Sequence, residues 1–426
     1  MRLELRSARV ERAAFGSKTH IADNLLQIDR DELRDLLSAD SRLRDIEIEL
    51  ANPGDDCRII DIFDIFEPRS KLDGKPNFPG LIDAPGRVGD GATAVARGAA
   101  VLVINANDDR FNTVVDMRGP AATLSPYAST ANVCIRARPA EGVDRSKYYL
   151  ALKLLGARAA VYIGDAAARS ENPAGEIFDL ARPSNHDGGQ LPRVAYIYML
   201  ASQQVPTEPD EPILYGDNVR HLVPTVLHPN EILDGAVIAP YWNFGAETFT
   251  VQNHPMVLEL YRRHGVDVDF AGVIAIIAAE TEAARSRTAL MAANLARYTL
   301  SADAVVITKY GGGIPESAVM ETYDACEDVG MKGAIAIWAH GGDGRIEGTL
   351  TFMSPRADAV VSCGISDDPV EMEPMARVIG RETIGPLIME REDDARPSGG
   401  ALTLRYQHIA GGINQLGGGF LSSEEY

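Results

Sequence analysis

The chain has 426 residues, and its 41 basic against 61 acidic side chains give a formal net charge of −20. Hydrophobic residues make up 45% and charged residues 24%, as in a soluble globular protein with room for roughly two or three domains. Phosphate repels so acidic a surface, which argues against nucleic acid as a partner. The apolar runs are too short to cross a bilayer, and residues 1–5 lack the apolar core of an export signal. We therefore expect a cytoplasmic protein with no membrane partner.

The first predicted domain, residues 1–145, is rich in strands. Residues 46–50 alternate apolar and acidic side chains, which is typical of a half-buried strand. Asp29, followed by further acidic residues and then leucines, predicts a capped helix start. Further short strands are expected over residues 2–10, 101–104 and 133–135.

The second predicted unit, residues 146–250, alternates helix and strand. We expect a helix over residues 146–155, followed by buried strands over 159–163, 193–198 and 235–238. The polar segments between them contain Pro and Gly and are expected to be loops.

The third predicted domain, residues 251–426, shows the clearest pattern. Apolar strands are expected over residues 272–277, 304–307, 333–337 and 357–362, with helices over 282–298 and 315–329 and a last strand over 402–406. Apolar strands that alternate with helices predict a parallel sheet covered on both faces. The predicted fold class is therefore α/β, with a strand-rich N-terminal region followed by doubly wound parallel-sheet units.

The cysteines give no sign of a zinc site or a disulfide framework. The four of them, Cys57, Cys134, Cys326 and Cys363, are widely separated and lack zinc-type spacing. We expect reduced, mostly buried thiols. No metal site is predicted, although a metal is not excluded.

Four side chains near the carboxyl ends of the predicted parallel strands are candidate catalytic groups, because open parallel sheets bind ligands at that edge. They are Glu280, Lys309, His340 and Cys363. A histidine there can act as an acid or a base, and a cysteine as a nucleophile. The alternatives are a carboxylate at a helix start, a loop histidine and a packed thiol.

A glycine-rich turn after the strand at 304–307 is a candidate binding site. Gly311, Gly312 and Gly313 let the backbone approach a ligand closely, and the following helix start favours a carboxylate or phosphate. A tight strand-to-helix turn that needs glycine is an equally good interpretation. Asn243 and Asp343, at two further strand exits, complete the predicted substrate-binding set.

Several stretches together resemble the pro-protein subunit of component B of glycine, sarcosine and betaine reductases, and they run through nearly the whole chain. They include residues 65–69, 78–80, 88–91, 132–134, 191–200, 223–225, 259–265 and 285–286. The resemblance implies reductive cleavage of a small amine substrate together with a homologous partner subunit that carries a cysteine or selenocysteine. It also implies that the precursor splits before a cysteine, which becomes a pyruvoyl group that binds the substrate amine.

This sequence departs from that family at the splitting site. The matching stretch is residues 240–247, where Asn243 is present but Phe244 stands in place of the cysteine. Pyruvoyl formation needs a side-chain oxygen or sulfur, and phenylalanine has neither. Thr248 and Thr250 are the nearest hydroxyls, and neither can yield a pyruvoyl group, because elimination leaves an extra methyl. We therefore predict an uncut chain without a pyruvoyl cofactor.

Three hypotheses for function follow. In the first, the chain is a subunit of a reductase-like hetero-oligomer that acts on a small amine or related polar substrate. In the second, it is a hydrolase or lyase that uses Glu280 and His340 in the strand-end cleft, alone or with a partner. In the third, it is a non-catalytic subunit that shapes the active site of a partner.

Overall fold

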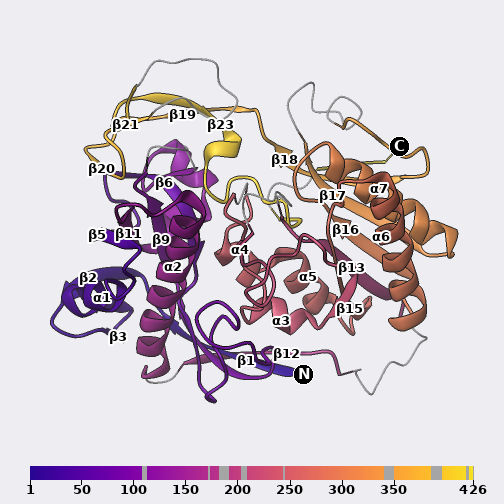
Figure 1. Ribbon diagram of the computed structural model, residues 1–426, viewed down its shortest axis with the longest axis horizontal. Coiled ribbons are helices and arrows are strands. Elements are labelled where there is room, and N and C mark those ends of the chain that lie inside the picture. The colour runs from indigo at the N-terminus through magenta and orange to yellow at the C-terminus, as the bar shows by residue number, and fades with distance from the viewer. Residues whose placement is uncertain are drawn as a thin grey trace.

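The computed structural model describes residues 1–107, 113–170, 173–181, 191–202, 209–242, 245–339, 350–384, 396–418 and 422–425. Figure 1 shows the N-terminal strands on one side of the view and a second, larger sheet on the other, with short helices between them. The α/β fold class is confirmed, because the described strands form mixed sheets with parallel neighbours and several helices pack against them.

Two sheets and one long helix form the N-terminal half. The first sheet has the order β12-β1-β8-β7, and the second β10-β6-β9-β11-β5, with β20 paired to β6. Their strands are β1 (Arg2–Arg9), β5 (Leu43–Ala51), β6 (Cys57–Phe66), β7 (Arg69–Lys71), β8 (Gly91–Arg97), β9 (Ala99–Asn105), β10 (Thr113–Asp116), β11 (Ala131–Pro139), β12 (Ala174–Asp179) and β20 (Arg377–Ile379). Helix α2 (Arg145–Ala168) packs on strands of both sheets.

Helix α2 corrects one prediction. Residues 159–163, expected to form a buried strand, belong to this helix, which is 24 residues long. Most of its side chains are buried, Ala159 and Ile163 among them, so the sequence lacks the one-sided apolar stripe of a surface helix. When a short apolar run is buried on all sides, its sequence pattern fits a strand and a helix equally well.

The second half contains a sheet of seven described strands in the order β14-β15-β13-β16-β17-β18-β24. The five inner strands run parallel, as the sequence predicts, and the two edge strands are antiparallel to their neighbours. They are β13 (Arg193–Met199), β14 (Thr225–Leu227), β15 (Asp269–Ile276), β16 (Ala304–Thr308), β17 (Lys332–Ala339), β18 (Ala359–Ile365) and β24 (Ser422–Glu425). The predicted strand over residues 235–238 is wrong, because Val237 makes only an isolated bridge to Leu214.

Helices α5, α6 and α7 pack on this sheet, α1 packs in the N-terminal half, and shorter elements complete the chain. The helices are α1 (Arg30–Leu37), α3 (Pro229–Leu233), α4 (Thr248–Gln252), α5 (Pro255–Arg263), α6 (Glu282–Asn294) and α7 (Ile314–Asp328), and single turns lie at Pro120–Leu124, Pro126–Ser129, Leu295–Thr299 and Tyr406–His408. The remaining strands are β2 (Arg12–Gly16), β3 (His20–Ala22), β4 (Leu25–Asp29), β19 (Pro369–Met372), β21 (Thr383–Ile384), β22 (Arg396–Pro397) and β23 (Leu402–Arg405). As predicted, Asp29 caps α1, because its side chain accepts from the amides of Asp31 and Glu32.

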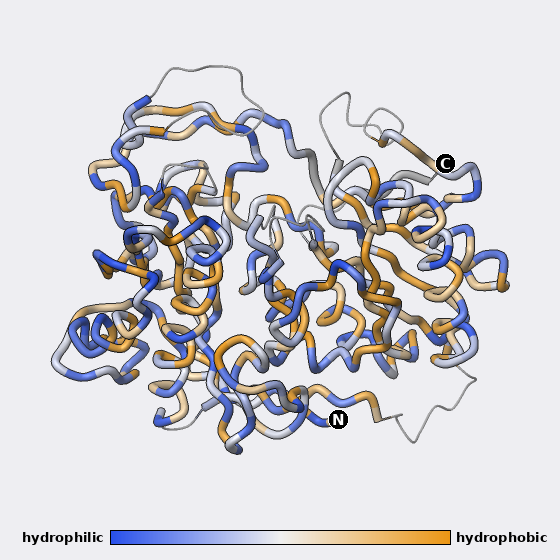
Figure 2. Tube along the Cα trace, in the orientation of Figure 1, coloured by the Kyte–Doolittle hydropathy of each residue, from blue (hydrophilic) through white to orange (hydrophobic). Residues whose placement is uncertain are grey.

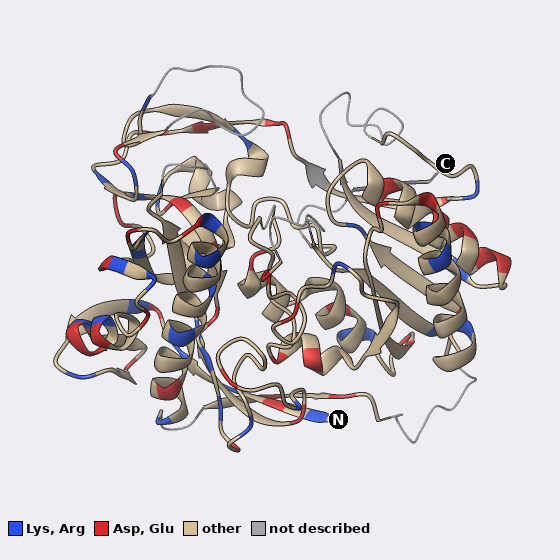
Figure 3. Ribbon diagram, in the orientation of Figure 1, with Lys and Arg blue, Asp and Glu red and all other residues tan. Residues whose placement is uncertain are grey.

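The interior is apolar and the helices over the sheet carry charge. The strands are largely orange in Figure 2, whereas Figure 3 marks acidic and basic residues along the outer helices. No helix in the described part of the chain is long and apolar enough to span a membrane. Helix α2 lies with the N-terminal sheets and β13 with the second sheet. The predicted domain limits at residues 145 and 250 stay predictions.

The contact between α2 and β7 gives a test of the packing. A Cβ on Gly164 lies 2.3 Å from the carbonyl carbon of Arg69, which is backbone and has little room to move. We expect Gly164→Ala to lower the free energy of unfolding by at least about 2 kcal/mol, measured by urea titration.

Gly175→Ala is the matched control, because a Cβ there meets only Glu4 Oε1, at 3.5 Å. Equal stability of the two variants contradicts the close packing of α2 on β7.

Candidate functional site

A largely buried segment, described over residues 239–242 and 245–248 and called the loop below, lies at the carboxyl end of the parallel sheet. Tyr310, two residues after the end of β16, donates its hydroxyl to the carbonyl of Trp242. From the C-terminal segment, the amide of Gln415 donates to the carbonyl of Gly245 at 3.3 Å. The loop is therefore held against the strand ends, where open α/β sheets place their ligand sites.

Thr248, at one end of this loop, bonds to the other end and also to a buried ion pair. Thr248 Oγ1 accepts from the amide of Ala239 at 3.0 Å and donates to Asp64 Oδ2 at 2.7 Å. Asp64 Oδ1 accepts from the Thr248 amide at 2.9 Å, and Lys153 Nζ lies 2.5 Å from Asp64 Oδ2. Both charged side chains are fully buried, and burial lowers the pKa of Lys153. Strand β6, helix α2 and the loop thus meet at one carboxylate.

Two further carboxylates are buried here, one in the loop and one in contact with it. Glu211 Oε1 accepts from the amide of Tyr241 at 2.9 Å, and Glu247 Oε1 accepts from the amide of Gly411 at 3.1 Å. Burial raises the pKa of Glu247. Burial, and then the charges of Glu211 and Glu247, raise the pKa of Tyr310 far above its usual range. The surroundings of the loop therefore favour positive charge.

Lys309 and the glycine turn use their polar groups internally. Lys309 Nζ lies 2.8 Å from the carbonyl of Gly311, 3.2 Å from Glu316 Oε1 and 5.3 Å from the ring centroid of Trp338. The Gly311 amide donates to Gln415 Oε1 at 2.6 Å. Gly312 and Gly313 are exposed, and Gly313 has a φ of 74°, which favours glycine. Here the tight-turn interpretation accounts for the described contacts.

The described hydrogen bonds and ion pair of Lys309 involve neither Glu280 nor Cys363. Glu280 is exposed, and its carbonyl accepts from Arg285. Cys363 is buried, and burial raises the pKa of its thiol to about 12, so it is a poor nucleophile. Asn243, His340 and Asp343 lie outside the described residues.

A buried histidine near the strand ends escaped the sequence reasoning. His254 Nε2 lies 3.2 Å from the hydroxyl of Tyr196, which lies 2.5 Å from Thr308 Oγ1 at the end of β16. Burial lowers the pKa of His254 to about 3. Asp64, Lys153, Glu211 and Glu247 were missed as well. The available signal was a charged residue within an apolar run, as at Asp64 in the wholly buried β6.

The fold and this loop define an α/β protein with a candidate site at the carboxyl ends of its parallel strands. The family model for glycine/sarcosine/betaine reductase component B subunits matches residues 1–423, and the chain belongs to this family.

Three similar proteins come from Peptoclostridium acidaminophilum. Glycine reductase complex component B subunits alpha and beta is 30% identical over the full length of both chains. Sarcosine reductase complex component B subunit alpha is 33% identical over 89% of each chain. Betaine reductase complex component B subunit alpha is 31% identical over 89% of this chain and 88% of its own. No solved structure matches this chain.

Removal of Lys153 tests the ion pair below the loop. We expect Lys153→Met to cost about 3–5 kcal/mol in the free energy of unfolding, because Asp64 is left as a buried charge without its cation. Urea titration measures this loss.

Lys147→Met, on the same helix, is the control, since its pair with Asp144 is exposed and we expect little change. The role given to Asp64 and Lys153 fails if the two variants lose the same stability.

The buried histidine predicts a dependence of stability on pH. The unfolded chain protonates His254 below about pH 6.5, whereas the folded chain resists protonation down to about pH 3. The contribution of the neutral His254 ring to the free energy of unfolding is therefore complete above pH 6.5 and is lost as the pH falls. Relative to His254→Asn, we expect the parent chain to lose about 2.5 kcal/mol between pH 7 and pH 4.5. Parallel stability curves for parent and variant, from urea titrations across this range, contradict the assignment.

Proposed function

We propose that this chain is a subunit of a reductase complex, acts on a small amine or a related polar substrate, and works as one uncut polypeptide. The match to the component B family over residues 1–423 carries the proposal. The three relatives named above are, by their names, subunits of reductase complexes, which supports a hetero-oligomer.

The surroundings of the loop support an amine substrate. Glu211 contacts the loop, Glu247 belongs to it, and both are buried, so their negative charge favours a cation close by. The loop is also the segment that carries Asn243 and Phe244. The described contacts hold both of its arms, so the substrate region is preorganised by groups from both halves of the chain.

A pyruvoyl group does not fit this chain, so we derive no step through it. Position 244 is a phenylalanine, which has no heteroatom to form an ester or thioester with the preceding carbonyl. Thr248 Oγ1 is engaged by Asp64 and Ala239 and is four residues away. Reduction of substrate then depends on a thiol or selenol that a partner subunit supplies.

Purification of the native complex, followed by intact mass spectrometry, tests the proposal. We expect one chain of 45.9 kDa that does not react with hydrazine, together with a partner that carries a reactive cysteine or selenocysteine. We expect substrate cleavage only when chain, partner and a dithiol are combined.

Phe244→Cys is the matched variant, because it restores a nucleophile at one position; fragments 1–243 and 244–426 are expected from it alone. If the parent chain is found as two fragments, cut after Asn243, the claim of an uncut polypeptide is wrong. Full turnover by the isolated chain without a dithiol ends the claim of partner dependence.

A further inference from the structure

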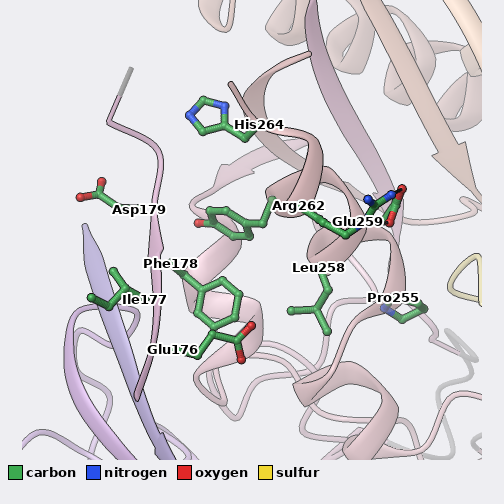
Figure 4. A pocket seen from close by; sticks show the side chains of 10 residues that line it. Glu176, Ile177, Phe178, Asp179, Pro255, Leu258, Glu259, Arg262 and His264 are labelled. Atoms are coloured by element: carbon green, nitrogen blue, oxygen red, sulfur yellow. Dashed lines mark hydrogen bonds and ion pairs between the residues drawn. The ribbon is translucent and has the colours of Figure 1, made fainter. Parts of the chain in front are cut away.

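A groove separate from the loop lies between the edge strand β12 and helix α5. It has a volume of about 560 Å³. Figure 4 shows β12 along one side and α5 along the other. Four consecutive strand residues, 176–179, line the groove, so it runs along the edge of the strand rather than over one face.

Along the edge of β12 that faces this groove, backbone amides and carbonyls point away from β1. Among the described residues, β12 pairs only with β1, with Phe178 opposite Leu3. The Phe178 carbonyl accepts from the side chain of Asn230 at 3.2 Å, so it points away from β1. Inward and outward residues alternate along an antiparallel pair, so the amide and carbonyl of Glu176 also point outward. An unpaired edge of this kind is a template for another strand.

The side chains around the groove are acidic at the rim and apolar inside. Glu176, Asp179 and Glu259 line it against one arginine, Arg262, and that arginine is already paired with Glu259 at 2.5 Å. Within the described part of the chain, Glu176 and Asp179 form no ion pair with a lysine or arginine. The floor contains Phe178 and Leu258, and the strand side adds Ile177, which is 53% exposed.

One wall also carries a histidine with an unused donor position. His264 Nδ1 accepts from the amide of Phe270 at 3.0 Å, which leaves the hydrogen of the neutral ring on Nε2. That nitrogen is buried and has no hydrogen-bond partner among the described residues. A peptide carbonyl is a suitable acceptor for it.

We propose that this groove binds an extended, basic segment of a partner protein, which adds as a strand along the edge of β12 beside Glu176, where the described residues leave the backbone without a strand partner. Backbone groups of Glu176 and the Phe178 amide hold its main chain. Its lysine or arginine side chains meet Glu176 on one face of the strand or Asp179 on the other. A second copy of this chain is disfavoured, because β12 paired with itself brings the carboxylates of two copies together. The proposal does not depend on the reaction proposed above.

Blocked five-residue peptides test the proposal on the full chain. We expect Lys-Val-Lys-Val-Lys to bind at least about tenfold more tightly than Glu-Val-Glu-Val-Glu, with an affinity that falls as salt rises. Hydrogen exchange must slow in β12 when the lysine peptide binds, because strand addition protects the outward amides. Lys-Val-Pro-Val-Lys lacks a central amide and is expected to bind more weakly.

Charge-reversal variants separate the groove from general attraction to an acidic protein. Glu176→Lys/Asp179→Lys is expected to weaken the lysine peptide about tenfold or more, whereas Asp31→Lys/Asp35→Lys on α1 changes net charge equally and is expected to leave binding near the parent value. Equal binding of the acidic and basic peptides, or binding without protection of β12, overturns the proposal. So does protection of the outward amides of Glu176 and Phe178 in the free chain: if it rises with protein concentration the occupant is a second copy, and if not it is the chain itself.

Discussion

The carboxylate of Asp64 is the contact on which the arrangement of the site depends. It accepts from the amide and hydroxyl of Thr248 and from the ammonium of Lys153, with all these groups buried. Desolvation of two charges costs several kcal/mol per ion, so such a pair adds little to stability relative to apolar packing. Its effect is one of geometry: β6, α2 and the start of α4 have one arrangement that satisfies the charges. Contacts to Asp64 therefore position both ends of the loop, at Ala239 and Thr248.

The loop is held from the other half of the chain as well. Tyr310 belongs to the exit of β16, whereas Gly411 and Gln415 belong to the segment after β23. Tyr310 and Gly411 are 101 residues apart in the sequence, yet both contact the described part of the loop. Phe244 offers this loop no nucleophile, and the described contacts that hold the loop involve other residues. The scaffold and the reactive group are therefore separate features of the sequence.

The sequence predicts the second sheet well because its inner strands are short apolar runs bounded by turn residues, as in β16 and β17. It fails within α2, where burial on most sides removes the periodicity that distinguishes a helix. For the site, the rule that ligands bind at the carboxyl ends of parallel strands predicts Lys309. It does not predict that the charge of Lys309 is paired with Glu316 inside the protein. Asp64 and Lys153 are 89 residues apart, and no local pattern encodes which buried charges meet. Pairings of this kind depend on the topology of the fold, and the sequence pattern predicts only the fold class.

The loop and the groove lie toward opposite ends of the second sheet. The loop contacts Tyr310, beyond the carboxyl end of β16, whereas His264 at the groove contacts Phe270, at the amino end of β15. Parallel strands of this length separate their two ends by about 25 Å. A segment bound along β12 thus leaves the strand-end site open to substrate. A subunit built in this way can hold a partner at one end of its sheet while substrate enters at the other, because no described side chain belongs to both surfaces.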